Sequence, residues 1–271
     1  MSKIIITGSQ GFIGGSVANH FLHKGEQVRS IPREMLYDRW DLQKYIEAEQ
    51  PDVILHFAAY GNHSFQTELG EIVEANIHCT LNLLEASKNV PYQALINTST
   101  SSVLLPKQTH YSASKMATEY FCKAFVDQYN KPIVSVRPFS IFGEREASHR
   151  FIPTVIRNAK EGNVFNLVPD ACHDWTYISD FIAGIETVIA NIQQLKGQSV
   201  NIGTGQQFSN LEVVEKIERI HGKKILYTIT RDMRNYDTDK WVAENSLLKL
   251  LGWKQKYSLT EGLQRTYDLA Q

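Results

Sequence analysis

Two side chains in the middle of the chain have the types and the spacing that proton transfer requires. Tyr111 and Lys115 are four residues apart at the entry to Ser112–Gln128, a segment whose apolar periodicity predicts a helix. This spacing places both side chains on one helix face. The pKa of an isolated tyrosine is about 10, and a neighbouring ammonium lowers it by stabilising the phenolate. The pair therefore predicts an acid and base for a substrate oxygen.

A run of hydroxyl side chains precedes this pair, at the end of the predicted strand Ala94–Thr98. The hydroxyls of the stretch Thr98–Ser102 are our candidates for a hydrogen bond to the substrate, because a hydroxyl near a reacting oxygen orients it and stabilises developing charge. A run of serine and threonine is also typical of a plain polar loop. The Tyr111/Lys115 pair nearby favours the functional interpretation.

A glycine-rich turn near the N-terminus indicates a dinucleotide site. Three glycines with the spacing GxxGxxG lie between the predicted strand Ile4–Thr7 and the predicted helix Phe12–Lys24. The first permits a sharp turn, the second lets the backbone approach a pyrophosphate, and the third permits close helix–strand packing. The amides at the start of the helix then face the phosphates. The expected cofactor-binding residues of this turn are Gly8, Gln10, Gly11, Phe12, Ile13 and Gly14.

The end of the second predicted strand, Val28–Ile31, indicates which nicotinamide cofactor binds. An acid at this place bonds the ribose 2′-hydroxyl of NAD, whereas an arginine accepts the 2′-phosphate of NADP. The chain has no acid here before Glu34, and Arg29 or Arg33 can bind a phosphate in bidentate fashion. We therefore expect NADPH, with Arg33 at its 2′-phosphate. The alternative is a solvated surface arginine.

Short β-branched runs alternate with amphipathic segments through the first half of the chain. The predicted strands are Ile4–Thr7, Val28–Ile31, Val53–Phe57, Ala94–Thr98 and Ile133–Arg137, and the predicted helices are Phe12–Lys24, Leu42–Glu49, Ile72–Lys88 and Ser112–Gln128. Such alternation is typical of α/β proteins and predicts a Rossmann-type, doubly wound parallel sheet.

After Pro138 this rhythm changes, which predicts a smaller C-terminal substrate-binding lobe. The expected elements there are a helix over Phe181–Ile192, a strand over Asn201–Gly205 and a helix over Leu211–His221. We assign residues 1–138 and 175–199 to the dinucleotide-binding domain. Residues 139–174 and 200–271 form the substrate-binding lobe in this prediction.

The overall composition argues against several classes of function. The 271 residues carry a formal net charge of −1, which favours neither nucleic acid nor a membrane surface as partner. No stretch reaches the roughly 18 apolar residues of a membrane span, and the apolar run at the N-terminus is too short for a signal peptide. The three cysteines are widely spaced and the nine histidines form no zinc motif, so we expect neither a disulfide nor a metal. These features predict a cytoplasmic protein.

Together these residues resemble the extended short-chain dehydrogenase/reductase superfamily, and within it the NAD-dependent epimerase/dehydratase group. The resemblance covers nearly the whole chain. Besides the glycine turn, the hydroxyl run and the Tyr111/Lys115 pair, it rests on Asp41-Leu42, His56–Ala59, Asn76, Arg137-Pro138, His173–Asp180, Asn201–Gly205 and Leu251–Trp253. It implies a Rossmann domain with a C-terminal lobe that binds a nucleotide-sugar.

The resemblance also implies roles for individual residues. Thr100, Tyr111 and Lys115 take the catalytic positions, with Lys115 also bonding the cofactor ribose. Cofactor contacts are implied for Asp41 and Leu42 at the adenine, for Phe57, Ala58 and Ala59 beside the pyrophosphate and ribose, for Asn76, and for Pro138 beside the nicotinamide. Substrate contacts are implied for Thr100, Ser101, Ser140, and Arg231 or Arg234 at the diphosphate. The two arginines are equally typical of a solvated face.

The chain departs from the family pattern at places that bear on its reaction. Dehydratases of the group follow the catalytic threonine with an Asp-Glu pair, but Ser101 and Ser102 stand here. Because elimination of water needs an acid and a base, a dehydratase is disfavoured. Ser140, His173 and Cys79 replace the usual Asn, Arg and Gly, and the first two replacements alter the expected substrate contacts. The chain is also short for the group.

The leading hypothesis is a reductase of a nucleotide-linked 4-keto-6-deoxyhexose in deoxysugar biosynthesis. Hydride passes from NADPH to C4, Tyr111 donates the proton and Thr100 holds the oxygen. One alternative is a nucleotide-sugar 4-epimerase, which uses the same residues and retains its NAD. Another is a non-catalytic NAD(P)-sensing binding protein, which the intact Tyr111/Lys115 pair disfavours. The resemblance further implies a homodimer formed through two helices of each subunit.

Overall fold

The computed structural model describes residues 1–63, 65–231 and 238–270, and the chain divides into two units. The first consists of Met1–Arg137 and Ile185–Val200, and the second of Pro138–Gly184 and Asn201–Gln271. The sequence predicts residues 175–184 for the first unit, but they fall in the second. The reason is that strand β9 (Trp175–Tyr177) pairs with strand β6 (Ser140–Phe142).

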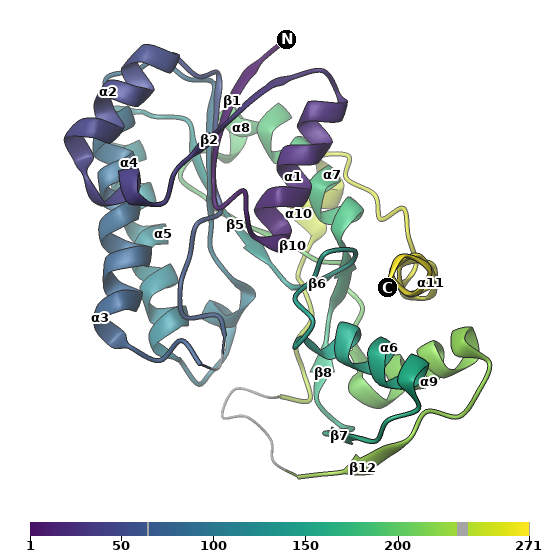
Figure 1. The fold of residues 1–271 in the computed structure, drawn as a ribbon. Coiled ribbons are helices and arrows are strands. Elements are labelled where there is room, and N and C mark those ends of the chain that lie inside the picture. Colours follow the sequence, from purple (N-terminus) through teal and green to yellow (C-terminus); the bar gives the residue numbers. More distant parts are fainter. Residues whose placement is uncertain (64, 232–237, 271) are drawn as a thin grey trace. The chain divides into compact units, whose positions relative to one another are not determined.

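A six-stranded sheet organises the first unit and confirms the predicted doubly wound α/β fold (Figure 1). Its strands are β1 (Lys3–Thr7), β2 (Gln27–Ile31), β3 (Val53–His56), β4 (Ala94–Thr98), β5 (Ile133–Pro138) and β10 (Ser199–Ile202). They lie in the order β10-β5-β4-β3-β1-β2, and the pairs from β2 to β5 are parallel. The carboxyl ends of parallel strands meet at one edge, which is where ligands bind in such sheets.

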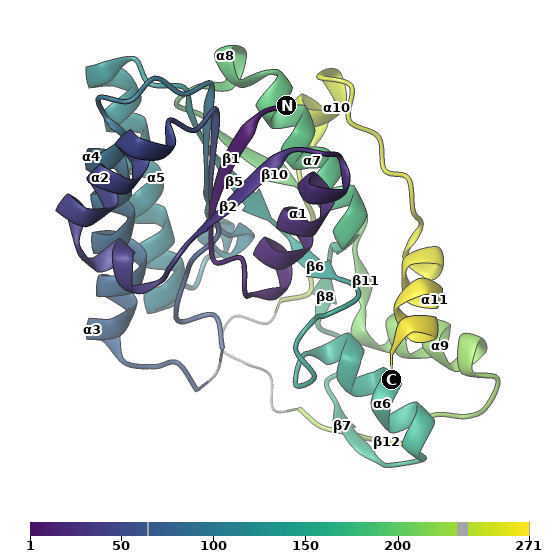
Figure 2. The same cartoon turned by 45° about the horizontal axis from the view of Figure 1, so that its top comes forward.

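Helices cover both faces of this sheet (Figures 1 and 2). The helices α2 (Arg39–Glu49), α4 (Cys79–Ser87) and α5 (His110–Tyr129) pack beside one another on one face, and α1 (Phe12–His23) lies on the other. His20 of α1 lies 3.0 Å from Glu186, in the part of α7 (Ile178–Ala190) that belongs to the first unit. Coverage of both faces explains the unbroken apolar runs of the strands, because neither face meets water. Ile4–Ile6 and Ala94–Ile96 are accordingly buried.

The predicted helix Ile72–Lys88 is divided in the structure. It consists of α3 (Leu69–Ile72), the π-helical segment η2 (Val73–His78) and α4. A π-helical turn widens the backbone by one residue and often occurs at functional sites. Hydrophobic periodicity does not reveal one extra residue in a helix, so this turn could not be predicted. Asn76 lies inside this turn and is fully buried.

The described residues of the second unit form short paired strands, three longer helices and the first part of α7. Besides β6 with β9, the strand pairs are β8 (Cys172–His173) with β11 (Phe208–Ser209), and β7 (Phe165–Leu167) with β12 (Tyr227–Ile229). Its longer helices are α6 (Phe151–Glu161), α9 (Asn210–His221) and α11 (Leu259–Leu269), and α10 (Ser246–Leu250) is short. The short α8 (Ile192–Leu195) belongs to the first unit. Helix α6 was not expected, and its Pro153 is accommodated because it stands in the first turn.

A buried carboxylate ties together the turns of the second unit. Asp174 is fully buried, and its oxygens accept hydrogen bonds from the amides of Thr204 (2.8 Å), Gly205 (2.8 Å) and Ala243 (3.0 Å). The hydroxyl of Thr204 donates a further bond at 2.7 Å. Several backbone amides around one carboxylate satisfy a charge that burial would otherwise disfavour. The motif residue Asp174 therefore has a structural role in this unit.

An ion pair in the first unit predicts a large loss of stability. Glu119 of α5 accepts two hydrogen bonds from Arg137 of β5, at 2.8 and 2.5 Å, and a third from Ser199. Removing one member of a buried pair leaves the other charge without compensation. We expect Glu119→Ala to lower the free energy of unfolding by about 3 kcal/mol in urea titrations. The matched control, Asp127→Ala, breaks the exposed pair with Lys123 on the same helix and should cost no more than about 0.5 kcal/mol. Equal losses in the two variants would contradict this expectation.

Candidate cofactor and catalytic site

The glycine turn after β1 is packed so closely that side chains are excluded from it. Gly8 has φ +69°, and a Cβ there would lie 2.7 Å from the amide nitrogen of Ala58. A Cβ on Gly14 would lie 2.3 Å from the carbonyl oxygen of Gly8. Real carbon–oxygen contacts are longer, so both positions require glycine. The backbone is therefore left bare at the carboxyl edge of the sheet.

The start of α1 adds hydrogen-bond donors to this turn. Gly11 is the N-cap residue, no side chain caps the helix, and the first turn holds no acid. The first amides of a helix have no acceptor within it, so those of Phe12, Ile13 and Gly14 can bind an anion. Gln10 is exposed beside them. The bare turn and the uncapped helix fit the pyrophosphate of a dinucleotide cofactor.

A buried chain of hydrogen bonds links the glycine turn to α4. The hydroxyl of Thr7 lies 2.8 Å from Nδ1 of His56, and Nε2 of that ring lies 3.0 Å from the hydroxyl of Thr80. The Thr7 oxygen also accepts a bond from the amide of Ala58 at 3.0 Å. Burial, aided by the Lys115 cation, lowers the pKa of His56 to about 3, so the ring is neutral at ordinary pH.

The chain of bonds continues from α4 to the helix that carries the proton-transfer pair. The Thr80 hydroxyl donates to the carbonyl of Asn76 at 2.5 Å. The Asn76 side chain in turn bonds both backbone groups of Tyr60 and the hydroxyl of Ser114, each at 2.8 Å. Ser114 donates to the carbonyl of Tyr111 at 2.8 Å. Asn76, predicted as a cofactor residue, thus connects the loop after β3 with the first turn of α5.

Tyr111 and Lys115 lie on consecutive turns of α5, as their spacing predicts. The start of this helix is fixed by a capping box between Thr109 and Ser112. Only 1% of Lys115 is exposed, and burial lowers its pKa to about 8. A buried ammonium is disfavoured unless an anion or a polar group stabilises it. Lys115 is therefore suited to stabilise a phenolate or to bond a cofactor hydroxyl.

The end of β4 presents several hydroxyl groups. Thr100 caps the short helix η3 (Ser101–Leu104), with its oxygen 2.9 Å from the hydroxyl of Ser102. Helix η3 packs against α5, and Ser101 is buried. Thr98 Oγ1 and Ser99 Oγ are also buried, and neither has a hydrogen-bond partner among the described residues. Such hydroxyls are rare in folded proteins. They fit a bound group that supplies the missing hydrogen bonds.

Arg33 lies just after β2, where a cofactor 2′-phosphate is expected. Its side chain is exposed and donates from Nε to the hydroxyl of Tyr37 at 3.2 Å, a bond that raises its pKa. A more distant negative charge, Glu71 of α3, also acts on it, and Glu71 bonds Tyr60. The end of β2 therefore combines one exposed cation with a nearby acid.

The structure corrects one predicted adenine contact. Leu42 is fully buried in the core, and its amide donates to the carbonyl of Asp38 at 3.0 Å, so neither its side chain nor its N–H is available to a ligand. Asp38 caps α2, which places Leu42 on the buried face one turn later. The carboxylate of Asp41 is exposed and pairs with Lys44. For Asp41 an adenine contact stays a prediction.

The remaining predicted cofactor residues lie at strand ends. Phe57, Ala58 and Ala59 follow β3 directly, and the backbone of Phe57 and Ala58 forms the surface against which Gly8 packs. Pro138 is the last residue of β5 and is buried. The site residues that sequence reasoning missed are Thr7, Thr80 and Ser114. These residues could have been recognised in the sequence because they are polar at positions where an apolar residue is expected to fill the core.

In the second unit Ser140 and His173, which replace residues usual in the resembled family, contact each other. The hydroxyl of Ser140 lies 3.1 Å from Nδ1 of His173. The His173 ring lies between Trp175 and Trp241, with ring centroids 4.9 and 5.1 Å away. One replacement is therefore accommodated by the other. Of the predicted diphosphate arginines, Arg231 is exposed after β12, and Arg234 lies outside the described residues.

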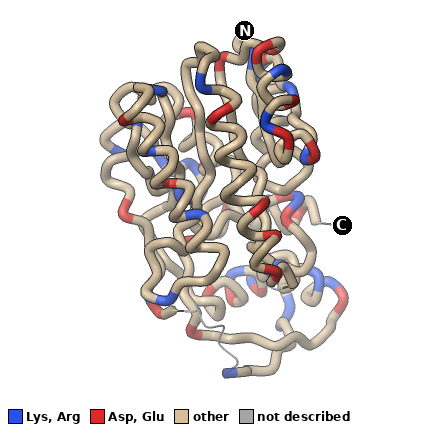
Figure 3. The backbone as a smooth tube through the Cα atoms, turned by 90° about the vertical axis from the view of Figure 1, so that its left-hand side faces the viewer, with Lys and Arg blue, Asp and Glu red and all other residues tan. Residues whose placement is uncertain are grey.

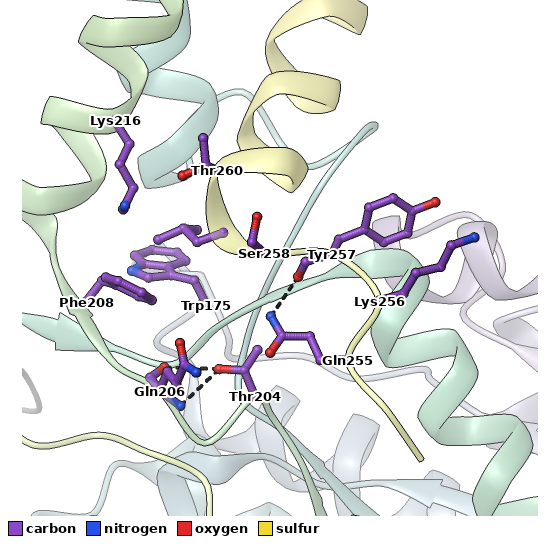
Figure 4. A pocket seen from close by; sticks show the side chains of 11 residues that line it. Trp175, Thr204, Gln206, Phe208, Lys216, Gln255, Lys256, Tyr257, Ser258 and Thr260 are labelled. Carbon is purple, nitrogen blue, oxygen red and sulfur yellow. Dashed lines mark hydrogen bonds between the residues drawn. The ribbon is translucent and has the colours of Figure 1, made fainter. Parts of the chain in front are cut away.

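The second unit also has a hollow of about 290 Å³ between α9, the start of α11 and the turn after β10 (Figure 4). Trp175, Phe208 and Lys216 form one side of it. The opposite wall is the loop before α11, which buried Asp180 fixes by accepting bonds from the amides of Lys256 (2.8 Å) and Tyr257 (3.1 Å). No predicted site residue lines this hollow.

Charge is distributed evenly along the chain. Figure 3 shows short blue stretches of Lys and Arg and red stretches of Asp and Glu scattered along the backbone, so a charged ligand must be held by local groups. Among the described residues, no three acidic, histidine or cysteine side chains are placed to hold a metal ion. In residues 1–63, 65–231 and 238–270, no helix is long and apolar enough to span a membrane.

The neutral His56 predicts a pH dependence of stability. Its pKa is lowered from 6.5 to about 3 on folding, so the unfolded chain binds more protons between these pH values. The stability that His56 contributes is fully present above about pH 6.5 and is lost as the pH falls toward 3. We expect the free energy of unfolding to rise less steeply with pH over this range in His56→Asn than in the wild type, measured by urea titration. Parallel curves for the two proteins would contradict this account.

Several known proteins are similar to this chain over most of its length. Residues 4–203 match the model of the NAD dependent epimerase/dehydratase family. The dTDP-glucose 4,6-dehydratase 1 of Escherichia coli is 24% identical over 98% of this chain and 92% of its own. The uncharacterized UDP-glucose epimerase YtcB of Bacillus subtilis is 26% identical over 96% of this chain and 95% of its own. A crystal structure of UDP-glucuronic acid 4-epimerase from Bacillus cereus, in complex with UDP-glucuronic acid and NAD, superposes with a TM-score of 0.85, at 25% identity and 98% coverage of both chains.

Proposed function

Because the chain belongs to the NAD-dependent epimerase/dehydratase family, we propose that it transfers hydride between a nicotinamide cofactor and a nucleotide-linked sugar. The observation that carries the proposal is the buried Lys115, one turn from Tyr111 on a helix that hydrogen bonds tie to the glycine turn. In this proposal the turn Gly8–Gly14 holds the pyrophosphate and Lys115 holds the ribose next to the nicotinamide. When bound, the cofactor supplies or accepts the hydride.

More specifically, the proposed reaction is reduction at C4 of a nucleotide-linked 4-keto-6-deoxyhexose. Tyr111 donates the proton to the new alkoxide, and Lys115 stabilises the phenolate that remains. Thr100 holds the same oxygen by a hydrogen bond. The second unit binds the nucleotide-sugar, with Ser140 and Arg231 or Arg234 among its contacts.

The residues after Thr100 argue against a dehydratase. Ser101 and Ser102 stand where elimination would need an acidic pair, and Ser101 is buried at the start of η3. A serine hydroxyl cannot act as both acid and base near neutral pH. The dehydratase chemistry named for one of the relatives is therefore not proposed for this chain.

A 4-epimerase is the second candidate function. The solved neighbour from Bacillus cereus is a 4-epimerase that holds NAD, and Tyr111 with Lys115 would serve this reaction equally well. The two reactions differ in the fate of the cofactor. A reductase exchanges its cofactor on every turnover, whereas an epimerase returns the hydride to the same sugar and retains NAD.

Cofactor analysis separates these candidates. We propose NADPH as cofactor because Arg33 is exposed at the end of β2 and no acid precedes Glu34 there. The protein is purified without added cofactor and denatured, and any released nicotinamide is identified by chromatography. An empty protein that binds NADPH more tightly than NADH supports the reductase. NAD at about one per chain supports the epimerase and removes the reductase proposal.

We propose that the protein forms a homodimer and that its small-molecule partner is a nucleotide-sugar. Helix α5 carries two exposed aromatic side chains, Tyr120 (70% exposed) and Phe121 (40% exposed), which a helix-to-helix contact would cover. Sedimentation equilibrium tests this part of the proposal directly, because a monomer at micromolar concentration would contradict it. The non-catalytic alternative would require that Tyr111 and Lys115 be retained without use.

A further inference from the structure

A continuous series of buried hydrogen bonds joins Thr7, His56, Thr80 and Asn76. In each of these bonds the donor is the residue nearer to Thr7 in the series. We propose that His56 is a positioning residue, held as the neutral Nε2–H tautomer, which keeps the cofactor turn and the Tyr111 helix in register. Its effect on turnover rests on the proposed function, whereas its effect on cofactor binding and its tautomer do not depend on the reaction.

The tautomer follows from counting donors and acceptors. A carbonyl only accepts, so the single hydroxyl proton of Thr80 goes to the carbonyl of Asn76 at 2.5 Å. The Thr80 oxygen must then accept from His56, which places the ring proton on Nε2 at 3.0 Å. A neutral ring has no second proton, so Nδ1 accepts from the hydroxyl of Thr7 at 2.8 Å. That oxygen accepts in turn from the amide of Ala58 at 3.0 Å. The opposite tautomer would leave no proton between Nε2 and the Thr80 oxygen, and it would leave the hydroxyl proton of Thr7 without His56 as its acceptor.

One side of the ring supports the cofactor turn. Thr7 is the last residue of β1 and immediately precedes Gly8, and its hydroxyl binds the amide of Ala58. This same amide would lie 2.7 Å from a Cβ on Gly8. The Nδ1 side of His56 therefore sets how closely the loop after β3 approaches the glycine turn. The hydrogen bonds that join His56, Thr7 and Ala58 are called the Thr7 arm.

The other side of the ring supports the catalytic helix. Thr80 is bonded to the carbonyl of Asn76 in the π-helical turn, and the side chain of that asparagine bonds Ser114 of α5. Ser114 bonds the carbonyl of Tyr111. The Nε2 side of His56 therefore sets the position of the first turn of α5. The hydrogen bonds that run from His56 through Thr80 and Asn76 to Ser114 are called the Thr80 arm.

Two substitutions break the arms separately. The amide oxygen of Asn takes the place of Nδ1, so His56→Asn keeps the acceptor for Thr7 and loses the Thr80 arm. The amide nitrogen of Gln takes the place of Nε2, so His56→Gln keeps the donor to Thr80 and loses the Thr7 arm. One hydrogen bond corresponds to about a tenfold effect. A residue that only fills the core would give two variants with the same defects.

The first test is the tautomer itself. The protein labelled with ¹⁵N-histidine is examined by NMR at pH 6 to 8, with His56→Asn used to assign the signals. We expect His56 to show a protonated Nε2, an unprotonated Nδ1 and no titration. A protonated Nδ1 or a charged ring would overturn the proposal whatever reaction the protein catalyses.

The second test is the division of effects between the variants. In His56→Asn the dissociation constant of the cofactor should stay within about twofold of the wild type, and kcat should fall about tenfold. In His56→Gln the dissociation constant should rise about tenfold, and kcat at saturating cofactor should stay within about twofold. His23→Asn, at an exposed histidine of α1, is the matched control.

The outcomes distinguish the two proposals. Equal losses of affinity and kcat in both variants, or no loss in either, would overturn the positioning role. If neither the wild type nor the variants turn over any nucleotide-sugar, the proposed function fails, but the affinity difference between Asn and Gln still decides the Thr7 arm. Circular dichroism and the urea midpoint of each variant identify one that fails to fold. For such a variant Thr7→Val and Thr80→Val break the same arms singly, and the same division of effects is required of them.

Discussion

Tyr111→Phe should lower kcat about a thousandfold and leave the dissociation constant of the cofactor within about twofold of the wild type. The substitution removes one oxygen atom from the first turn of α5 and keeps the ring. The proton for the substrate oxygen is then lost, while the glycine turn and Lys115, which hold the cofactor in our proposal, remain. Steady-state rates and cofactor titration by fluorescence measure the two quantities separately.

Tyr129→Phe is the matched control for this experiment. Tyr129 is the last residue of the same helix and is 42% exposed, so loss of its hydroxyl should change neither rate nor affinity. Wild-type turnover in Tyr111→Phe would remove this residue from the chemistry. A fall in cofactor affinity as large as the fall in rate would assign Tyr111 to binding instead.

Gly14→Ala should raise the dissociation constant of the cofactor at least about a hundredfold and destabilise the fold by about 1 to 3 kcal/mol. The new Cβ would lie 2.3 Å from the carbonyl oxygen and 2.8 Å from the carbonyl carbon of Gly8. Both contacts are with backbone, so α1 must move away from the turn and its amides lose their place at the pyrophosphate. Calorimetric titration and urea unfolding measure the two effects.

Gly70→Ala is the control for the added methyl group. Gly70 lies in α3, and a Cβ there would meet nothing within 4 Å. Alanine is the better helix former, so stability should be unchanged or slightly higher. Cofactor affinity should be that of the wild type. If Gly14→Ala behaved like this control, the glycine turn would not be the cofactor site.

The strands of the sheet could be predicted because the pattern of apolar residues that forms each strand lies within a few consecutive residues. The central strands β1, β3, β4 and β5 are mostly apolar runs whose buried faces leave no polar alternation, and all five predicted strands occur. Gly8 and Gly14 were predictable for the same reason, since their conformation and close packing exclude a Cβ. The Tyr111/Lys115 spacing needs only helix geometry.

The parts that were not predictable depend on contacts distant in sequence. Leu42 resembled an adenine contact by its position in a motif, but the capping of α2 by Asp38 turns it into the core. The π-helical turn around Asn76 depends on partners at Tyr60 and Ser114, so no periodicity within the segment indicates it. The hydrogen bond between Ser140 and His173 joins two residues that replace the usual ones of the family. The sequence alone does not show that these two replacements are in contact.

The most direct test of the central claim is the fate of the hydride. The protein is incubated with NADPH deuterated at the transferable position of C4 and with a nucleotide-linked 4-keto-6-deoxyhexose, and the product is examined by mass spectrometry and NMR. We predict one deuterium at C4 of the sugar for each NADPH oxidised, and none with Tyr111→Phe on the same timescale. A sugar without deuterium, formed while the NADPH stays reduced, would contradict the proposed reduction.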